Sequence, residues 1–262
     1  LLWFDDFVWG VPRIVLILAV VIFLTIRLRV LQVRQLPRAL KYMVKNEEGG
    51  HGEVTSFGAL CTALSATIGT GNIVGVATAL VAGGPGALFW MWIAAFFGMA
   101  TKYAEGVLAI KYRKVEKDGH VLGGPFYYIE RGMGENWRWL AKIFAFFGAG
   151  VGLLGIGTFT QVNGIASAVN GFFDPNNAWT VSLFGMDYSW TVVITGIILT
   201  ICVGLVVIGG IKRIAHVSEI IVPFMAVAYI TCCVIILIVN ASAIPAAFVE
   251  IIQSAFGLRA VT

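Results

Sequence analysis

Long apolar runs, separated by short stretches rich in Lys and Arg, make up most of this chain. Six runs reach about the 20 residues that a helix needs to cross a bilayer. They cover residues 8–28, 55–81, 86–110, 139–170, 189–209 and 217–240. The strands of a membrane β-barrel would instead alternate in polarity at every second residue, which these runs do not. The pattern predicts an all-α polytopic membrane protein.

Composition supports this class. The chain of 262 residues is 59% hydrophobic and 12% charged, whereas a soluble domain carries about 25% charged residues. All four cysteines lie in apolar runs without a CxxC spacing, so we expect buried thiols rather than disulfides or a metal site. Neither an HExxH nor a GxSxG motif is present, and the ionisable residues within the runs form no set of nucleophile and base. We therefore do not expect an enzyme.

The basic residues predict how the runs are oriented. Of the 18 Lys and Arg residues, 15 belong to the segments between the first and second, third and fourth, and fifth and sixth runs, when Arg27 and Lys142 at the run ends are counted with the adjoining segments. The AGGPG turn after the second run and the GFFDPNNAWTVSLFGMDYS stretch after the fourth have none. Because basic loops stay in the cytoplasm, we expect the N-terminus outside and a multi-pass protein of the cell membrane.

Glycine, threonine and asparagine interrupt the second run. Five glycines fall between Gly69 and Gly84, with Thr70 and Asn72 among them. An unpaired backbone group costs several kcal/mol in lipid, so a broken helix persists only where it lines a protein cavity. The alternative is a glycine-rich face that packs against other helices. The polar residues among the glycines favour a binding site inside the membrane.

The chemistry of this break indicates its ligands. Residues 65–72 supply hydroxyls, a carboxamide and freed backbone groups. Unwound carbonyls can coordinate Na⁺, and the N-terminus of the following half-helix attracts a carboxylate. Oxygen donors without a carboxylate suit a monovalent cation better than Ca²⁺ or Zn²⁺.

Other polar residues also lie within the runs. Gln161 and Asn163 are amides that can bond to a ligand or across helices, and a tilted fourth run would bring Gln161 level with the break. Lys102 and Glu105 have i, i+3 spacing. They either neutralise each other as a structural pair or take part in gating or coupling.

Three weaker patterns have plainer explanations. The GVGLLG sequence at 150–155 matches a dinucleotide motif but lies inside an apolar run, so close helix packing explains it better. His216 and Glu219 lack further metal ligands nearby and indicate a solvated helix start at the cytoplasmic face. Residues 120–134 predict a short interfacial helix rather than a plain loop, with Glu130 and Arg131 as a candidate ion pair.

Five blocks of the chain resemble one transporter family. The block GGPGALFWMWIAAFFG (83–98) is similar to the signature of the alanine or glycine:cation symporter family. The other four blocks are LSATIGTGNIVGVATA (64–79), GMATKYAEGVLAIKYR (98–113), GGPFYYIERGMG (123–134) and FTQVNGIASAVN (159–170). The resemblance implies Na⁺-coupled, or sometimes H⁺-coupled, symport of a small neutral amino acid such as alanine or glycine, with no organic cofactor.

The resemblance also implies a fold and a set of site residues. The fold is the leucine-transporter-type inverted repeat, in which residues 8–28 form an extra N-terminal helix and the other five runs form the first repeat. By this match Thr70, Gly71 and Gln161 contact the substrate. The sodium ligands implied are Thr67 and Asn72 in one site, with Ser65 and the backbone of Ile68 near a second.

The length of the chain departs from the family pattern. Family members are nearly twice as long, and this chain ends at AFGLRAVT, about where the sixth core helix is expected. We therefore expect residues 1–262 to lack the second repeat. The alternatives to alanine or glycine symport are transport of another small solute or amino acid on the same fold, or an inactive fragment. A channel would need polar stripes along several helices, which these runs lack. The preferred substrate, the ion and the oligomeric state are not predicted by the sequence.

Overall fold

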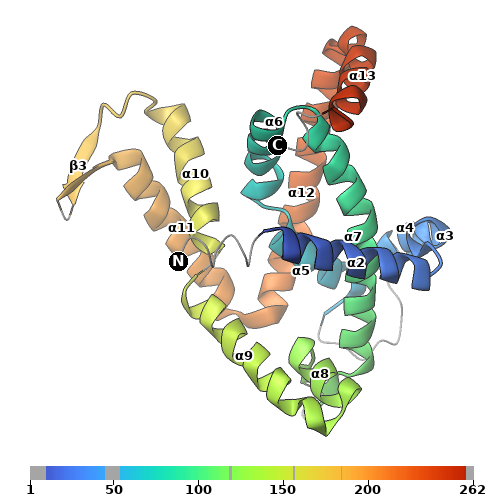
Figure 1. Cartoon of the computed structure of the whole chain (residues 1–262). Helices are drawn as coiled ribbons and strands as arrows, with labels where there is room; N and C mark the ends of the chain where they lie inside the picture. Colours follow the sequence, from blue (N-terminus) through green and yellow to red (C-terminus); the bar gives the residue numbers. More distant parts are fainter. Residues whose placement is uncertain (1–9, 45–53, 118–119, 156, 184, 258–262) are drawn as a thin grey trace. The chain divides into compact units, whose positions relative to one another are not determined.

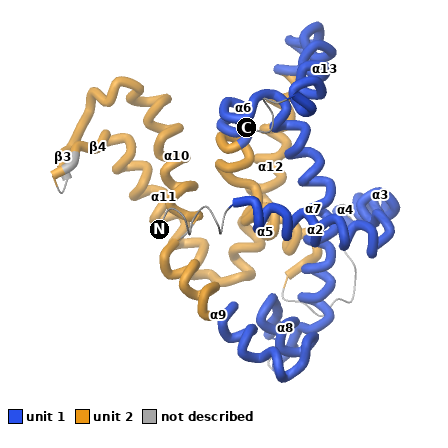
Figure 2. Tube along the Cα trace, in the orientation of Figure 1, with its two compact units in different colours: residues 1–53, 76–145, 236–262 blue, residues 54–75, 146–235 orange. Residues whose placement is uncertain are grey.

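The computed structural model describes residues 10–44, 54–117, 120–155, 157–183 and 185–257 (Figure 1). Residues 8–9 of the predicted first span and Lys45 of the basic stretch lie outside this part. The chain divides into two compact units (Figure 2). The first comprises residues 1–53, 76–145 and 236–262, and the second comprises residues 54–75 and 146–235.

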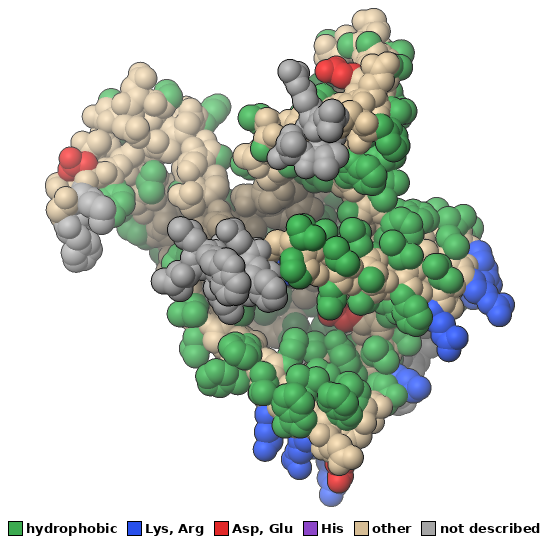
Figure 3. Space-filling model, in the orientation of Figure 1, with side chains coloured by type: hydrophobic (Ala, Val, Ile, Leu, Met, Phe, Trp, Pro, Cys, Tyr) green, Lys and Arg blue, Asp and Glu red, His purple; other side chains and the backbone are tan. Residues whose placement is uncertain are grey.

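Four helical stretches of the described chain are long and apolar enough to cross a membrane. They are α7 (Gly86–Lys111), the stretch Glu135–Phe173, α11 (Trp190–Ile208) and α12 (Gly210–Val239). Large apolar side chains project from them into open space, as at Phe224, which is 75% exposed. Figure 3 shows such side chains over the visible helices, with Lys and Arg gathered near α3–α4 and α8. The described chain is therefore a mainly helical protein with apolar outer faces, as expected of a membrane protein.

In the first unit, α2 (Val11–Arg27) packs against α7. After α2 the chain turns through α3 (Leu31–Arg34) and α4 (Leu36–Val44). The buried Gln32 at this turn donates from Nε2 to Thr25 Oγ1 (3.0 Å) and to the carbonyl of Phe96 on α7 (3.2 Å). One amide therefore links the turn after α2 to the middle of α7.

A helix that the sequence analysis did not predict, α13 (Ile244–Ala255), packs on the start of α7. It follows the short helix η3 (Ala241–Ala243). The indole Nε1 of Trp90 donates to the carbonyl of Ala255 at 3.1 Å. A Cβ on Gly86 would lie 2.6 Å from the backbone nitrogen of Ala255, so only glycine permits this approach. Two residues of the 83–98 block thus hold α13.

The connection after α7 contains the predicted short helix. A hairpin of β1 (Lys114–Val115) and β2 (Val121–Leu122) precedes α8 (Pro125–Met133), and η2 (Glu135–Trp137) leads into α9 (Arg138–Leu153). The expected ion pair is replaced by another: Glu130 pairs with Arg138 at 3.1 Å, while Arg131 donates to the carbonyl of Arg113 at 3.3 Å. Adjacent residues on a helix point in different directions, which accounts for the separate partners.

The second unit holds α5 (Ser56–Thr67), η1 (Thr70–Asn72), α10 (Thr158–Phe173), α11, and parts of α9 and α12. The helix α6 (Val74–Gly83) continues from it into the first unit. The apolar run 139–170 is divided between α9 and α10, because Gly155 (φ +62°) and Gly157 (φ +92°) adopt left-handed conformations between them. Within the GFFDPNNAWTVSLFGMDYS stretch before α11, β3 (Thr180–Leu183) and β4 (Met186–Ser189) form a hairpin.

Asp174 joins the end of α10 to the start of α11. Its carboxylate accepts hydrogen bonds from the backbone N–H of Ala178 (2.8 Å), the N–H of Trp179 (3.2 Å) and Ser189 Oγ (3.1 Å). The backbone N–H of Ala178 lowers the pKa of Asp174 most, and the N–H of Trp179 and the hydroxyl of Ser189 lower it further. Burial of the carboxylate opposes this shift. Thr191 on α11 also donates to Asn170 on α10. These bonds hold α10 and α11 together at one end.

We predict that this junction depends on the charge of Asp174. A lowered pKa in the folded state means that the stabilisation is present above the ordinary pKa, about 3.9, and is lost as the pH falls through the lowered value. At neutral pH, Asp174→Asn removes the charge and should speed hydrogen exchange of residues 174–189 about tenfold. Exchange measured by mass spectrometry tests this, with Asp187→Asn in the same hairpin as the control. Equal protection in both variants would contradict the role of Asp174.

Candidate functional site

The helix predicted to be broken is interrupted over residues 68–73. Helix α5 ends at Thr67, and Ile68 (φ −84°, ψ 110°) and Gly69 (φ −142°, ψ −168°) are extended. The short helix η1 follows before α6 begins at Val74. Neither half is long enough to cross a bilayer, since α5 has 12 residues and α6 has 10. The break therefore frees carbonyl groups at the end of α5 and N–H groups at the start of α6.

Gln161 on α10 satisfies one freed backbone group. Its side-chain Oε1 accepts a hydrogen bond from the backbone N–H of Thr70 at 2.9 Å. Both residues are half-buried. The predicted proximity of Gln161 to the break is thus present in the structure, and Gln161 contacts the backbone of Thr70 directly.

Two glycines permit this contact, and the sequence analysis did not single them out for it. A Cβ on Gly69 would lie 2.4 Å from Nε2 of Gln161, and a Cβ on Gly164 would lie 2.6 Å from Cγ2 of Thr70. Gly164 is three residues beyond Gln161, so both lie on the face of α10 that meets the break. The sequence FTQVNG does hold Gln161 and Gly164 at the spacing of one helix face. A single sequence does not show, however, that this face of α10 meets Gly69 and Thr70.

The hydroxyls before the break have their protons bound within α5. Ser65 Oγ donates to the carbonyl of Thr62 (2.8 Å), and Thr67 Oγ1 donates to the carbonyl of Ala63 (2.7 Å). A hydroxyl that donates its proton keeps oxygen lone pairs for an acceptor role. Both side chains are exposed. Together with the freed carbonyls of α5, they form a set of neutral oxygen donors that suits Na⁺.

Gly71 and Asn72 leave the other side of the break open. Both are exposed, and a Cβ on Gly71 would meet no described heavy atom within 4 Å. The structure thus arranges Ser65, Thr67, Ile68, Thr70, Gly71 and Asn72 along one interrupted helix, with Gln161 against it. Asn163 is exposed on α10.

The remaining charged candidates belong to other helices than the one interrupted at residues 68–73. Lys102 Nζ and Glu105 Oε2 form an ion pair of 3.0 Å on α7, in which the Lys102 side chain is 77% exposed. Their pairing fits a structural role, and gating remains a prediction. The described residues include no group of three or more His, Cys, Asp and Glu side chains placed to hold a metal ion. His216 and Glu219 lie inside α12, not at a helix start, because α12 begins at Gly210.

Comparison with known proteins places the chain in a family. The model of the sodium:alanine symporter family matches residues 1–262. The chain belongs to the sodium:alanine symporter family. An uncharacterised transporter of Haemophilus influenzae is 53% identical over 256 residues, 98% of this chain and 52% of that protein.

Two proteins with more specific names are also similar to the chain. The sodium/alanine symporter AgcS of Methanococcus maripaludis is 49% identical over 260 residues, which is 98% of this chain and 54% of AgcS. The amino-acid carrier protein AlsT of Bacillus subtilis is 35% identical over 258 residues, or 98% of this chain and 51% of AlsT. The chain thus spans about half the length of the curated relatives that it matches.

We predict that Gly69 is required for the bond between Gln161 and Thr70. In the extended conformation of residue 69, alanine causes no backbone strain, but its Cβ displaces the amide of Gln161. Gly69→Ala should lower the free energy of unfolding by about 1 kcal/mol, the net value of such a bond. The loss should nearly vanish when Gln161→Ala is already present. Denaturant titration in detergent micelles measures both values.

Gly71→Ala is the control for this cycle, because open space surrounds its Cβ and the contact of Gln161 is left intact. If Gly69→Ala costs the same free energy with and without Gln161, the steric explanation is wrong.

Proposed function

We propose that the protein is a secondary active symporter that takes up alanine or glycine together with Na⁺ across the cell membrane. The observation that carries this proposal is the interrupted helix at 68–73, which presents freed backbone groups beside Gln161. Membership of the sodium:alanine symporter family supports the coupling and the class of substrate. Na⁺ or H⁺ serves as the coupling ion.

The substrate would bind at the second half of the break. Thr70 and Gly71 lie directly before α6, whose N-terminal N–H groups and dipole favour the carboxylate of an amino acid. Gln161 holds the N–H of Thr70 and adds a carboxamide beside it. The open space at Gly71 supports a small ligand at this point.

Sodium would bind at the first half of the break. Thr67 and Asn72 would contribute to one site, and Ser65 with the backbone of Ile68 to a second. The hydroxyl protons of Ser65 and Thr67 are held by carbonyls of α5, which leaves their oxygen lone pairs as acceptors, although Ser65 Oγ already accepts one bond from Ser218 Oγ. Ion binding would stabilise the outward-facing state, and joint occupancy by ion and substrate would permit the change to the inward-facing state.

This scheme includes the leucine-transporter-type inverted-repeat fold. Residues 1–262 would contribute the extra N-terminal helix and the first repeat, with the N-terminus outside, and a second repeat would complete the site. The other half of the proposed site would come from that repeat, so transport has to be tested in the full-length protein.

Uptake of labelled alanine into proteoliposomes tests the proposal. An inward Na⁺ gradient should drive accumulation, and replacing Na⁺ with choline should abolish it unless a proton gradient is supplied. Alanine uptake that is unaffected by removing both gradients would contradict symport. Competition by a panel of amino acids distinguishes alanine or glycine from another small solute, and unit conductances without coupling would indicate a channel.

Substitutions at the break should separate the two ligands. Gln161→Ala should raise the half-saturation concentration for the amino acid about tenfold, the expected effect of losing a hydrogen bond to a charged ligand or to the backbone that holds it. Thr67→Val should raise the half-saturation concentration for Na⁺ instead, because valine has nearly the shape of threonine but lacks its hydroxyl oxygen. Gln253→Ala, on the exposed face of α13, is the matched control and should change neither value.

A further inference from the structure

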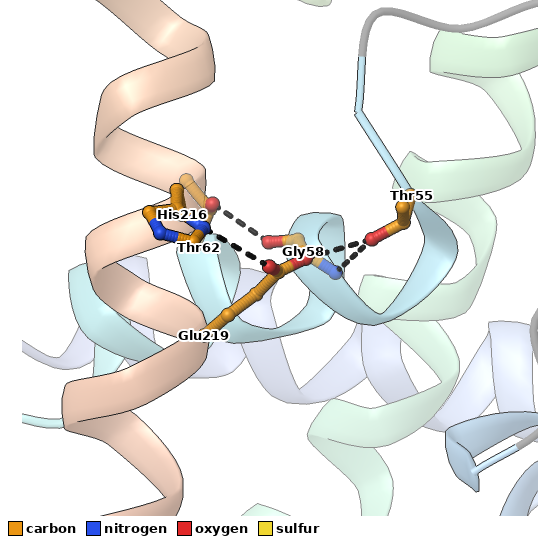
Figure 4. A network of polar contacts seen from close by, with 5 residues as sticks. All are labelled: Thr55, Gly58, Thr62, His216 and Glu219. Carbon is orange, nitrogen blue, oxygen red and sulfur yellow. Dashed lines mark hydrogen bonds and ion pairs between the residues drawn. The ribbon is translucent and has the colours of Figure 1, made fainter.

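Thr55 connects the beginning of α5 to α12. As the N-cap of α5, its Oγ1 accepts a hydrogen bond from the backbone N–H of Gly58 at 2.9 Å. The same hydroxyl donates its proton to Glu219 Oε1 on α12 at 2.7 Å (Figure 4). The other carboxylate oxygen of Glu219 lies 3.9 Å from Nδ1 of His216, one turn earlier on α12. One hydroxyl thus completes the helix end and attaches it to a neighbouring helix.

Glycine at position 58 allows the carboxylate to approach so closely. A Cβ there would lie 2.4 Å from Glu219 Oε1. The side chain of Glu219 is 28% exposed and bonds to α5, so it is not the solvated group that the sequence suggested.

A second contact lies about two turns further along α5. Ser218 Oγ donates to Ser65 Oγ at 3.3 Å. Residues 58, 61 and 65 follow the spacing of one helix face, and Cys61 on this face is 2% exposed. Gly58, Cys61 and Ser65 thus form a narrow stripe of small residues on α5, and a polar contact with Glu219 or Ser218 of α12 lies near each end of this stripe. Such a stripe has few interlocking apolar side chains to oppose separation.

This stripe ends at the proposed site. Ser65 is two residues before the last residue of α5, and the break begins at Ile68. Beyond the break, Gln161 holds Thr70. Any tilt of α5 away from α12 would therefore move Ser65 and Thr67 relative to Thr70.

We propose that Glu219 is a positioning residue that acts as a latch: it holds Thr55, keeps α5 against α12, and releases α5 when the site opens toward the cytoplasm. This proposal rests on the proposed transport function. It also uses the predicted cytoplasmic location of the start of α5. Glu219 touches neither substrate nor ion in this scheme and acts through the angle of α5.

Labelling of Cys61 in the full-length protein tests the latch. Cys61 is kept as the single cysteine, and its rate of reaction with a small thiol reagent is measured in membranes. Glu219→Ala and Gly58→Ala should each raise this rate about tenfold, the effect of losing a hydrogen bond to a charged group. Glu250→Ala and Gly196→Ala are the matched controls, since Glu250 is exposed on α13 and a Cβ on Gly196 meets open space.

Gly58→Ala separates the latch from helix stability. Alanine favours a helix over glycine, so this substitution should stabilise α5 itself while it displaces Glu219. A purely structural contribution of residue 58 to α5 would make Cys61 less reactive, whereas the latch predicts that it becomes more reactive.

A reversal experiment separates the latch from the N-cap. Thr55→Asp preserves a good N-cap but places a second carboxylate against Glu219, so Cys61 should react faster. Adding Glu219→Gln should restore slow labelling, because the new amide can donate to the introduced carboxylate. Equal rates in the parent and Glu219→Ala, or no recovery in the double variant, would overturn the latch.

These readouts distinguish the latch from the transport proposal. The labelling rates do not depend on transport, so they stand even where uptake proves independent of Na⁺ and H⁺. Where uptake is coupled, Glu219→Ala should raise the half-saturation concentration for external substrate by a larger factor than it lowers the maximal rate of uptake. External Na⁺ should also protect Cys61 from the thiol reagent less in this variant than in the parent. Coupled uptake with unaltered Na⁺ protection would also overturn the latch.

Discussion

A backbone N–H that a helix break leaves without its helical partner needs another acceptor, and at Thr70 that acceptor is the side chain of Gln161. The interruption of the helix at 68–73 depends on such contacts, since a backbone polar group that is buried without a partner is costly. The bond also requires two glycines. Gly69 on the broken helix and Gly164 on α10 each leave room for atoms that any larger residue would displace. One contact between α10 and the broken helix therefore supplies an acceptor for the N–H of Thr70 and brings the two segments close together.

The helices around the break are connected mainly through polar groups near their ends. Asp174 and Asn170 fix α10 to the α11 junction, so α10 presents Gln161 from a helix that is itself anchored. At the start of α5, Thr55 bonds to Glu219. Between Thr55 and the break, one face of α5 carries the small residues Gly58, Cys61 and Ser65. In a membrane, apolar faces gain little by packing against each other rather than lipid, so localised polar contacts have a large share in setting helix positions. A few such bonds can also be exchanged without repacking a core.

The sequence predicted the features that depend on local interactions and missed those that depend on contacts between distant residues. The break was predictable because Gly69, Gly71 and Thr70 act on their own backbone, and the apolar runs were visible from composition. The division between α9 and α10 was missed because Gly155, inside GVGLLG, fits close helix packing equally well, and Gly157 lies just beyond that motif. Only the structure shows that both glycines adopt left-handed conformations and end the helix. Glu219 was misjudged because its partner, Thr55, lies 164 residues away. Contacts over such distances leave no periodic signal.

The 83–98 block illustrates why a motif and a site need not coincide. Its residues Gly86 and Trp90 hold α13, through a close backbone approach and an indole hydrogen bond to Ala255. The groups suited to ion and substrate lie earlier, at 65–72. The most distinctive stretch of the chain thus has a packing role in the first unit, while the candidate site uses a sequence of small, common residues. In the proposed site the binding groups come from backbone exposed by a break rather than from rare side chains, so its signature is the pattern of glycine, threonine and asparagine.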